Sequence, residues 1–165
     1  MLRDEILKEH SKAQTLKIID FIGTDKQKFD ALMQLFLYDE YRVSQRAAWP
    51  VSLIIEKHPE LAKKYLPKML DNLKNPVHDA VRRNTVRILY HIDIPEKLHA
   101  QVLDICFAFV QKRETSVAVK SFSIDILDKL SKQYPEIKNE IKILIDDQLP
   151  TATAAFKSRA KKIKL

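Results

Sequence analysis

The segment Ala80-Val81-Arg82-Arg83 decides the fold, because a segment of the same kind returns at a fixed interval along the chain. It appears earlier as Val43-Ser44-Gln45-Arg46, and later as Val117-Ala118-Val119-Lys120 and Ala154-Ala155-Phe156-Lys157. Consecutive copies, each ending in a cation, lie 37 residues apart. A fixed period of this length is typical of stacked helical repeats, in which each repeat buries its apolar face against its neighbours. The sequence therefore predicts a repeat architecture that offers a binding surface.

The composition favours helices throughout the chain. A single glycine among 165 residues argues against tight hairpins, phosphate-cradling loops and glycine-rich nucleotide folds. The most abundant residues include lysine, leucine, isoleucine and alanine, and most of these are good helix formers. Seven prolines are spread along the chain and separate its segments. We therefore expect an all-α fold.

Three Pro-Glu dipeptides, at 59–60, 95–96 and 135–136, mark the expected starts of helices. Proline at the first helical position loses no hydrogen bond, and the adjacent glutamate is favoured by the helix dipole. Apolar residues at helical spacing follow each dipeptide. A second helix then carries the recurring cation. We expect these second helices over roughly 42–57, 77–92, 115–133 and 152–163.

One stretch resembles a known family. The pattern Leu66-Pro67-x-Met69-Leu70-x-x-Leu73-x-Asn75-Pro76, followed by Val81-Arg82-Arg83-x-Thr85, resembles a HEAT repeat. The resemblance covers roughly residues 25–165. It departs from the family at the turn, where the usual aspartate is Asp39 in one repeat and another residue elsewhere. The resemblance implies an α-solenoid that serves as a scaffold, gripping protein partners or nucleic acid along a concave face.

Combining the period with this resemblance gives a prediction for the whole chain. We expect a single α-solenoid domain over 1–165, a right-handed α-α superhelix of about four HEAT-like helical hairpins plus an N-terminal cap. Residues 1–24 form the cap, which is atypical because it ends the apolar core against water. The HEAT-like repeats are expected at 25–58, 59–94, 95–134 and 135–165.

Positive charge is unevenly distributed. The net charge is +7, and two segments carry the excess: residues 41–75 have a balance of +4 and residues 150–165 a balance of +5. Such surfaces attract polyanions in a salt-dependent way. The sequence therefore allows an acidic protein partner or a nucleic acid.

The recurring cations form the candidate partner-binding site. They are Arg46, Arg83, Lys120 and Lys157, with Arg87 and Lys161 one turn further along two of the helices. Residues four apart share one helical face, so these side chains could form a track for an acidic peptide or a phosphate backbone. The alternative is that they cap the carboxyl ends of preceding helices and hold neighbouring repeats together.

The aromatic residues have two interpretations as well. Trp49 precedes Pro50 within an expected helix, where proline removes a backbone hydrogen bond and bends the helix. Trp49 could grip a peptide or stack on a base, so we include it in the candidate site. Packing between helices is the simpler interpretation for Trp49 and for Tyr38, Tyr41 and Tyr90.

Catalytic chemistry finds little support. No common catalytic motif is present, and no two of the five histidines stand three or four residues apart. We therefore expect no enzyme activity, no cofactor and no metal.

Some HEAT-like proteins are DNA glycosylases that excise alkylated bases with an aspartate flanked by aromatic residues. In that alternative Trp49, Arg83 and Arg87 would act with Asp125 or Asp128, although both acids also fit a solvated helix face beside lysines.

The remaining features concern compartment. Cys106, the one cysteine, lies in an apolar run and is expected to be buried. No segment approaches the ~18 uncharged apolar residues of a membrane span, and the first residues lack the apolar run of a signal peptide. We expect a cytoplasmic, non-catalytic module that binds a protein partner, with no membrane contact and no small-molecule substrate. Nucleic-acid binding on a basic face is the alternative.

Overall fold

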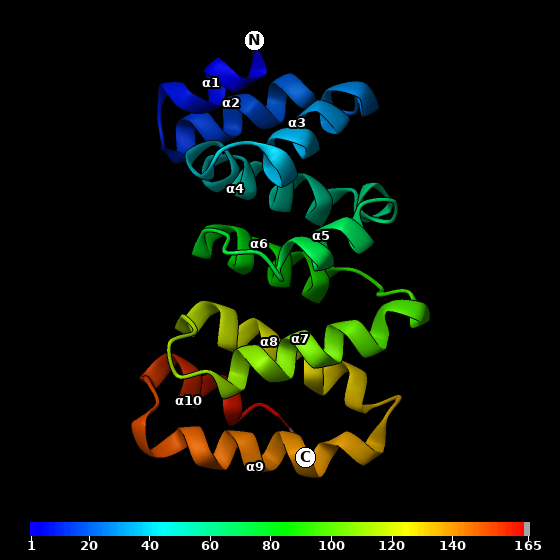
Figure 1. Cartoon of the computed structure of the whole chain (residues 1–165), viewed down its shortest axis with the longest axis vertical. Helices are drawn as coiled ribbons and strands as arrows, with labels where there is room; N and C mark the ends of the chain where they lie inside the picture. Colours follow the sequence, from blue (N-terminus) through cyan, green and yellow to red (C-terminus); the bar gives the residue numbers. More distant parts are fainter. Residues whose placement is uncertain (164–165) are drawn as a thin grey trace. The chain divides into compact units, whose positions relative to one another are not determined.

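The computed structural model describes residues 1–163, and every regular element within them is a helix (Figure 1). The predicted all-α class is therefore confirmed. The chain divides into two compact units, with unit 1 covering Met1–Ile92 and unit 2 beginning at Asp93. The helices of the first two expected repeats lie in unit 1 and those of the last two lie in unit 2.

Unit 1 is organised around one long helix, α4 (Tyr41–Lys57). This helix packs against α1 (Leu2–Lys8), α2 (Lys12–Ile22), α3 (Lys26–Tyr38) and α6 (Asp79–His91), as Figure 1 shows. The shorter α5 (Leu66–Asn72) contacts α3. Helices α4 and α6 are two of the predicted second helices, and they lie next to one another in the stack.

Polar side chains cap the starts of α2 and α3 in unit 1, and glycine ends α2. Ser11 accepts a hydrogen bond from the Gln14 backbone N–H at the start of α2, and Asp25 does the same for α3. Gly23, the one glycine, follows α2 with a φ of 52°, a conformation that residues with a Cβ rarely adopt. Local chemistry thus sets the helix boundaries in this region.

Burial of the helical apolar faces stabilises unit 1. Phe29, Leu32 and Phe36 of α3 are at most 1% exposed, and Val51 and Ile55 of α4 are fully buried. Burying a large apolar side chain contributes about 1.5–3 kcal/mol. Their spacing of three or four residues is the helical period that the sequence shows.

Unit 2 is organised around α8 (Val117–Ser131) in the same way. This helix packs against α7 (His99–Gln111), α9 (Lys138–Gln148) and the short α10 (Ala154–Ala160), as Figure 1 shows. Cys106 of α7 is fully buried, and burial raises the pKa of its thiol to about 12. Cys106 is therefore an inert core residue, as the sequence predicts.

The Pro-Glu dipeptides do not begin α-helices. They lie in short 3₁₀ turns, at Pro59–Ala62, at Glu96–Leu98 after Pro95, and at Pro135–Ile137. The α-helices α5, α7 and α9 start later, and Pro67 is the second residue of α5. The fixed φ of proline suits the first turn of either kind of helix, and 3₁₀ turns are frequent at helix starts. A fourth 3₁₀ turn, Leu149–Thr151, precedes α10.

One prediction about packing is wrong. Tyr38, Tyr41 and Tyr90 are exposed rather than packed between helices, because each lies near the end of its helix. His99, by contrast, begins α7 and has a buried side chain. The His99 ring lies 2.9 Å from the Tyr134 hydroxyl and 2.8 Å from the Ile94 carbonyl oxygen, so both ring nitrogens have partners.

Among the helices of residues 1–163, none combines the length and apolar character needed to cross a membrane.

Candidate binding pocket of the first unit

A pocket of about 350 Å³ lies in unit 1 between α4 and α6. Its residues come from the α1–α2 connection and from one face of each helix. They are His10, Gln45, Trp49, Ala80, Arg83, Asn84 and Arg87. The structure thus brings three of the predicted site residues, Trp49, Arg83 and Arg87, into one pocket.

Helical spacing explains why these side chains meet. Gln45 and Trp49 are four residues apart on α4, and Arg83 and Arg87 are four apart on α6. Residues at this spacing lie on the same side of a helix, one turn from each other. Because α4 and α6 pack directly together, the two faces line a common groove.

A buried polar contact fixes the floor of the pocket. Asn84 is only 3% exposed, and its side-chain amide donates to the Ala80 carbonyl oxygen at 2.8 Å. Its carbonyl oxygen lies 2.8 Å from the hydroxyl of buried Ser52, which donates to it across the α4–α6 interface. This contact ties α4 to α6 at the pocket.

The two arginines of the pocket differ in their partners. The Arg87 guanidinium donates to the Glu56 carboxylate at 2.8 Å, and His91 lies 3.7 Å from the same carboxylate. Arg83 is exposed and has no ion-pair partner among residues 1–163. None of the lining residues is an acid. The pocket therefore presents one uncompensated guanidinium.

Trp49 supplies the apolar wall of the pocket. Its side chain is partly buried and faces the groove, while the neighbouring Pro50 is buried within α4. Proline has no backbone N–H, so the carbonyl of Arg46, four residues earlier, lacks its usual helical donor. Part of the Trp49 side chain is thus buried in the protein, and the rest is accessible to a ligand in the pocket.

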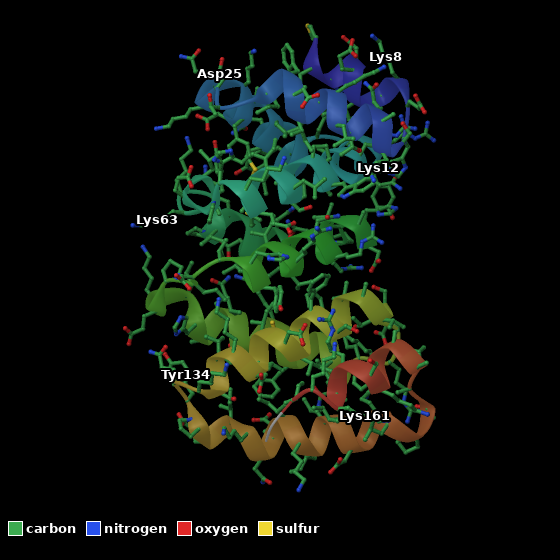
Figure 2. The ribbon with its side chains drawn as sticks, turned by 180° about the vertical axis from the view of Figure 1, so that it is seen from behind. Lys8, Lys12, Asp25, Lys63, Tyr134 and Lys161 are labelled. Atoms are coloured by element: carbon green, nitrogen blue, oxygen red, sulfur yellow. The ribbon has the colours of Figure 1, made fainter. Side chains whose placement is uncertain are left out.

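The other recurring cations are placed differently. Arg46 donates to the Leu7 carbonyl oxygen at 2.7 Å and so caps the carboxyl end of α1. In unit 2, Lys120 is only 8% exposed and donates to the Gln148 side chain at 2.7 Å. Lys157 on α10 and Lys161 just after it, labelled in Figure 2, are exposed. Arg46 and Lys120 therefore have the role of holding helices together.

Sequence reasoning did not identify His10, Gln45 or Asn84 as pocket residues. Gln45 and Asn84 immediately precede or follow cations of the repeat, and their spacing from Trp49 and Ala80 is four residues. Because residues four apart share a helical face, this spacing could have identified Gln45 and Asn84 as pocket residues. His10 lies before the first clear repeat, where the period gives no guidance.

Asp125, assigned to a solvated helix face or to a catalytic role, is instead largely buried against Arg159 of α10. The Arg159 Nη1 atom lies 2.6 Å from Asp125 Oδ2, and the Asp125 side chain is 13% exposed. The contact is an ion pair rather than a directed hydrogen bond, since Oδ2 has no hydrogen-bond partner of suitable geometry. Burial raises the Asp125 pKa to about 6, and the Arg159 charge opposes that shift. Within residues 1–163, no three His, Cys, Asp or Glu side chains are grouped to hold a metal ion.

Comparisons with known proteins agree with the resemblance seen in the sequence. A family model described as a HEAT repeat domain matches residues 2–164. The match begins well before residue 25, so it includes the segment expected to be a degenerate cap. No curated protein and no solved structure matches the chain.

Proposed function

The chain belongs to the HEAT-repeat family, and on that premise we propose that it is a non-catalytic binding module that holds an acidic segment of a protein partner. The segment would enter the pocket of unit 1 between α4 and α6. The observation that carries the proposal is the position of Arg83, exposed at the mouth of a pocket that contains no acid.

Arg83 and Trp49 together suit an acidic side chain next to an apolar one. A guanidinium binds a carboxylate through two parallel hydrogen bonds, and such charge-assisted bonds are stronger than neutral ones. Trp49 offers a large, rigid apolar surface in the same pocket. Tryptophan and arginine are also the residues most often found at the energetic centres of protein interfaces.

The distribution of cations favours a protein segment over a phosphate backbone. A backbone of regularly spaced phosphates is bound by a series of free cations. In unit 1, Arg46 is used to cap α1 and Arg87 is neutralised by Glu56, so Arg83 is the member of this group left free. One free guanidinium in a discrete pocket matches one carboxylate better than a track of phosphates.

The proposed module carries out no chemistry. In unit 2, Asp125, one of the two carboxylates considered for the glycosylase alternative, is engaged by Arg159 and is largely buried. Its role is that of an internal contact between α8 and α10. The helical pairs of the family in turn supply a rigid surface rather than a reactive centre.

Trp49 provides the experiment, because it is the one tryptophan of the chain and lines the pocket. We would titrate the full chain with peptides that combine glutamate or aspartate with apolar residues, and follow the tryptophan emission. Single- and double-stranded DNA and RNA would be titrated in parallel at low and at physiological salt. We expect saturable emission changes with a subset of the acidic peptides at physiological salt.

The variant Arg83→Glu tests the residue that carries the proposal. Charge reversal should lower peptide affinity about thirtyfold or more, because the carboxylate would face a like charge. The matched control is Arg82→Glu, which makes the same charge change at the neighbouring position outside the pocket. Equal losses for both variants would mean that net charge alone drives binding. Tight nucleic-acid binding at physiological salt, with no peptide binding, would replace the proposal with the nucleic-acid alternative.

A further inference from the structure

A second pocket, of about 330 Å³, lies in unit 2 beside the start of α8. It is formed by the α7–α8 connection, the first turn of α8, and the segment from the end of α9 to α10. Its polar lining residues are Arg113, Thr115, Lys120, Gln148, Thr151 and Thr153. The lining contains two cations and three hydroxyl groups, and it contains no acid.

Lys120 is the unusual residue of this pocket. The residue is only 8% exposed, yet the hydrogen-bond partner of its ammonium is a neutral amide, the Gln148 oxygen at 2.7 Å. No carboxylate within residues 1–163 forms an ion pair with it. Burial lowers the pKa of Lys120, and the charge of Arg113 lowers it further, while the charge of Glu114 opposes both.

An ammonium that is shielded from water and has no ion pair is costly, and an anion that enters the pocket can offset that cost. Ions taken out of water require an opposite charge or several well-placed dipoles to be stable. The Gln148 amide satisfies one of the three donors of the Lys120 ammonium. The other two donors are available to a group that enters the pocket, and Arg113, exposed on the rim, provides a second positive charge.

The start of α8 adds further donors at the same place. Thr115 and Val117, which flank the N-cap residue Ser116, both line the pocket. Ser116 makes no capping hydrogen bond to the first turn of α8, and its buried hydroxyl has no hydrogen-bond partner among residues 1–163. The free N–H groups of a helix start attract anions. Across the pocket, Thr153 accepts a bond from the Phe156 N–H, so its own hydroxyl hydrogen remains available.

From these contacts we propose that the pocket of unit 2 binds a small phosphate monoester. A phosphate presents three terminal oxygens and about two negative charges, which suits two cations surrounded by hydroxyl and amide donors. A volume of about 330 Å³ is at the small end of ligand pockets and accommodates a phosphate with a short organic group. The apolar side chains of Val117 and Phe156 lie in the same lining and would contact that group. This site is independent of the partner pocket in unit 1.

The experiment is isothermal titration calorimetry of the full chain with three probes at physiological salt. The probes are inorganic phosphate, glycerol 3-phosphate and, as a carboxylate of similar charge, malonate. We expect glycerol 3-phosphate to bind with one-to-one stoichiometry and more tightly than inorganic phosphate, because the organic group adds contacts. Equal or tighter binding of malonate would overturn the assignment to phosphate, and absence of binding by all three would overturn the site.

Variants locate the binding to this pocket. Arg113→Gln removes an exposed cation and should weaken glycerol 3-phosphate binding about tenfold or more without affecting folding. Lys120→Met retains most of the buried volume and should abolish binding, with circular dichroism confirming the fold. Lys132→Met is the matched control, because Lys132 is an exposed lysine just after the far end of α8. Unchanged affinity in Arg113→Gln, or an equal loss in Lys132→Met, would overturn the proposal.

Discussion

The two units use the same repeat position in opposite ways. In unit 1 the cation of α6, Arg83, is exposed at the mouth of a pocket, whereas in unit 2 the cation of α8, Lys120, is a buried residue in the lining of one. Both lie early in the second helix of a pair, 37 residues apart. The difference teaches that a repeat specifies where a cation stands on its helix, while the neighbouring residues decide whether its side chain faces solvent or the interior.

The causes of the difference are local. Arg83 lies on the exposed side of α6, whereas the next residue, Asn84, faces the α4–α6 interface and accepts a hydrogen bond there from Ser52. Lys120 instead has Gln148 from α9 within reach, and the residue is only 8% exposed. Arg46 shows a third solution, since it reaches back to the Leu7 carbonyl of a preceding helix.

Truncating the buried cation should have the largest effect on stability. Lys120→Ala removes a buried aliphatic stem and leaves Gln148 without its partner, so we expect the free energy of unfolding to fall by about 2–4 kcal/mol. Lys157→Ala changes the equivalent position of the last repeat, which is exposed, and should stay within about 0.5 kcal/mol of the parent. Urea denaturation followed by circular dichroism measures both. Similar losses for the two variants would remove the distinction between buried and exposed members.

The buried acid of unit 2 should make its stability depend on pH. The Asp125 pKa is raised to about 6 in the folded chain, so its contribution is fully present below its ordinary pKa near 3.8 and is lost as the pH rises through 6. Relative to Asp125→Asn, the parent should therefore lose about 2–3 kcal/mol between pH 4 and pH 7. Unfolding free energies across this range measure the difference. Parallel pH profiles for the two proteins would show that Asp125 is solvated after all.

Replacing the helix-capping Arg46 or the free Arg83 of unit 1 should change the free energy of unfolding by smaller amounts, and the two losses should differ. Arg46→Ala removes a charged hydrogen bond to the Leu7 carbonyl and should cost about 1–2 kcal/mol. Arg83→Ala removes an exposed side chain that has no ion pair within residues 1–163, and should cost less than about 0.5 kcal/mol. Thermal unfolding of both variants makes the comparison. A larger loss for Arg83→Ala would indicate that Arg83, too, holds the helices together.

Periodicity predicted much of the fold and part of the pocket. The four expected second helices correspond to α4, α6, α8 and α10, and the four-residue spacing placed Arg83 and Arg87 together. The 3₁₀ turns were missed because proline suits the first turn of both helix types. The spacing of residues along the sequence shows which of them share a helical face. It did not predict the burial of Lys120, because it gives no information about a residue of another helix, such as Gln148, that contacts this face.

The ion pairs between repeats follow a rule that the sequence could have revealed. Lys64 pairs with Asp30, and Arg159 with Asp125, and in each pair the two residues are 34 positions apart. Adjacent repeats bring residues about one period apart into contact, so opposite charges slightly short of 37 positions apart are candidates for pairing. Only the lysines near Asp125 in the sequence were considered as its partners, so the pairing of Asp125 with Arg159 of the next repeat was not predicted.

A double-mutant cycle between Arg83 and a bound acidic peptide tests the central claim most directly. The cycle would combine Arg83→Gln with a glutamate-to-glutamine change in the tightest peptide from the Trp49 fluorescence titration. A direct ion pair in the pocket predicts a coupling energy of about 1.5 kcal/mol or more, so that the second change costs little once the first is made. Additive losses at every acidic position of the peptide would contradict the claim that Arg83 binds the carboxylate.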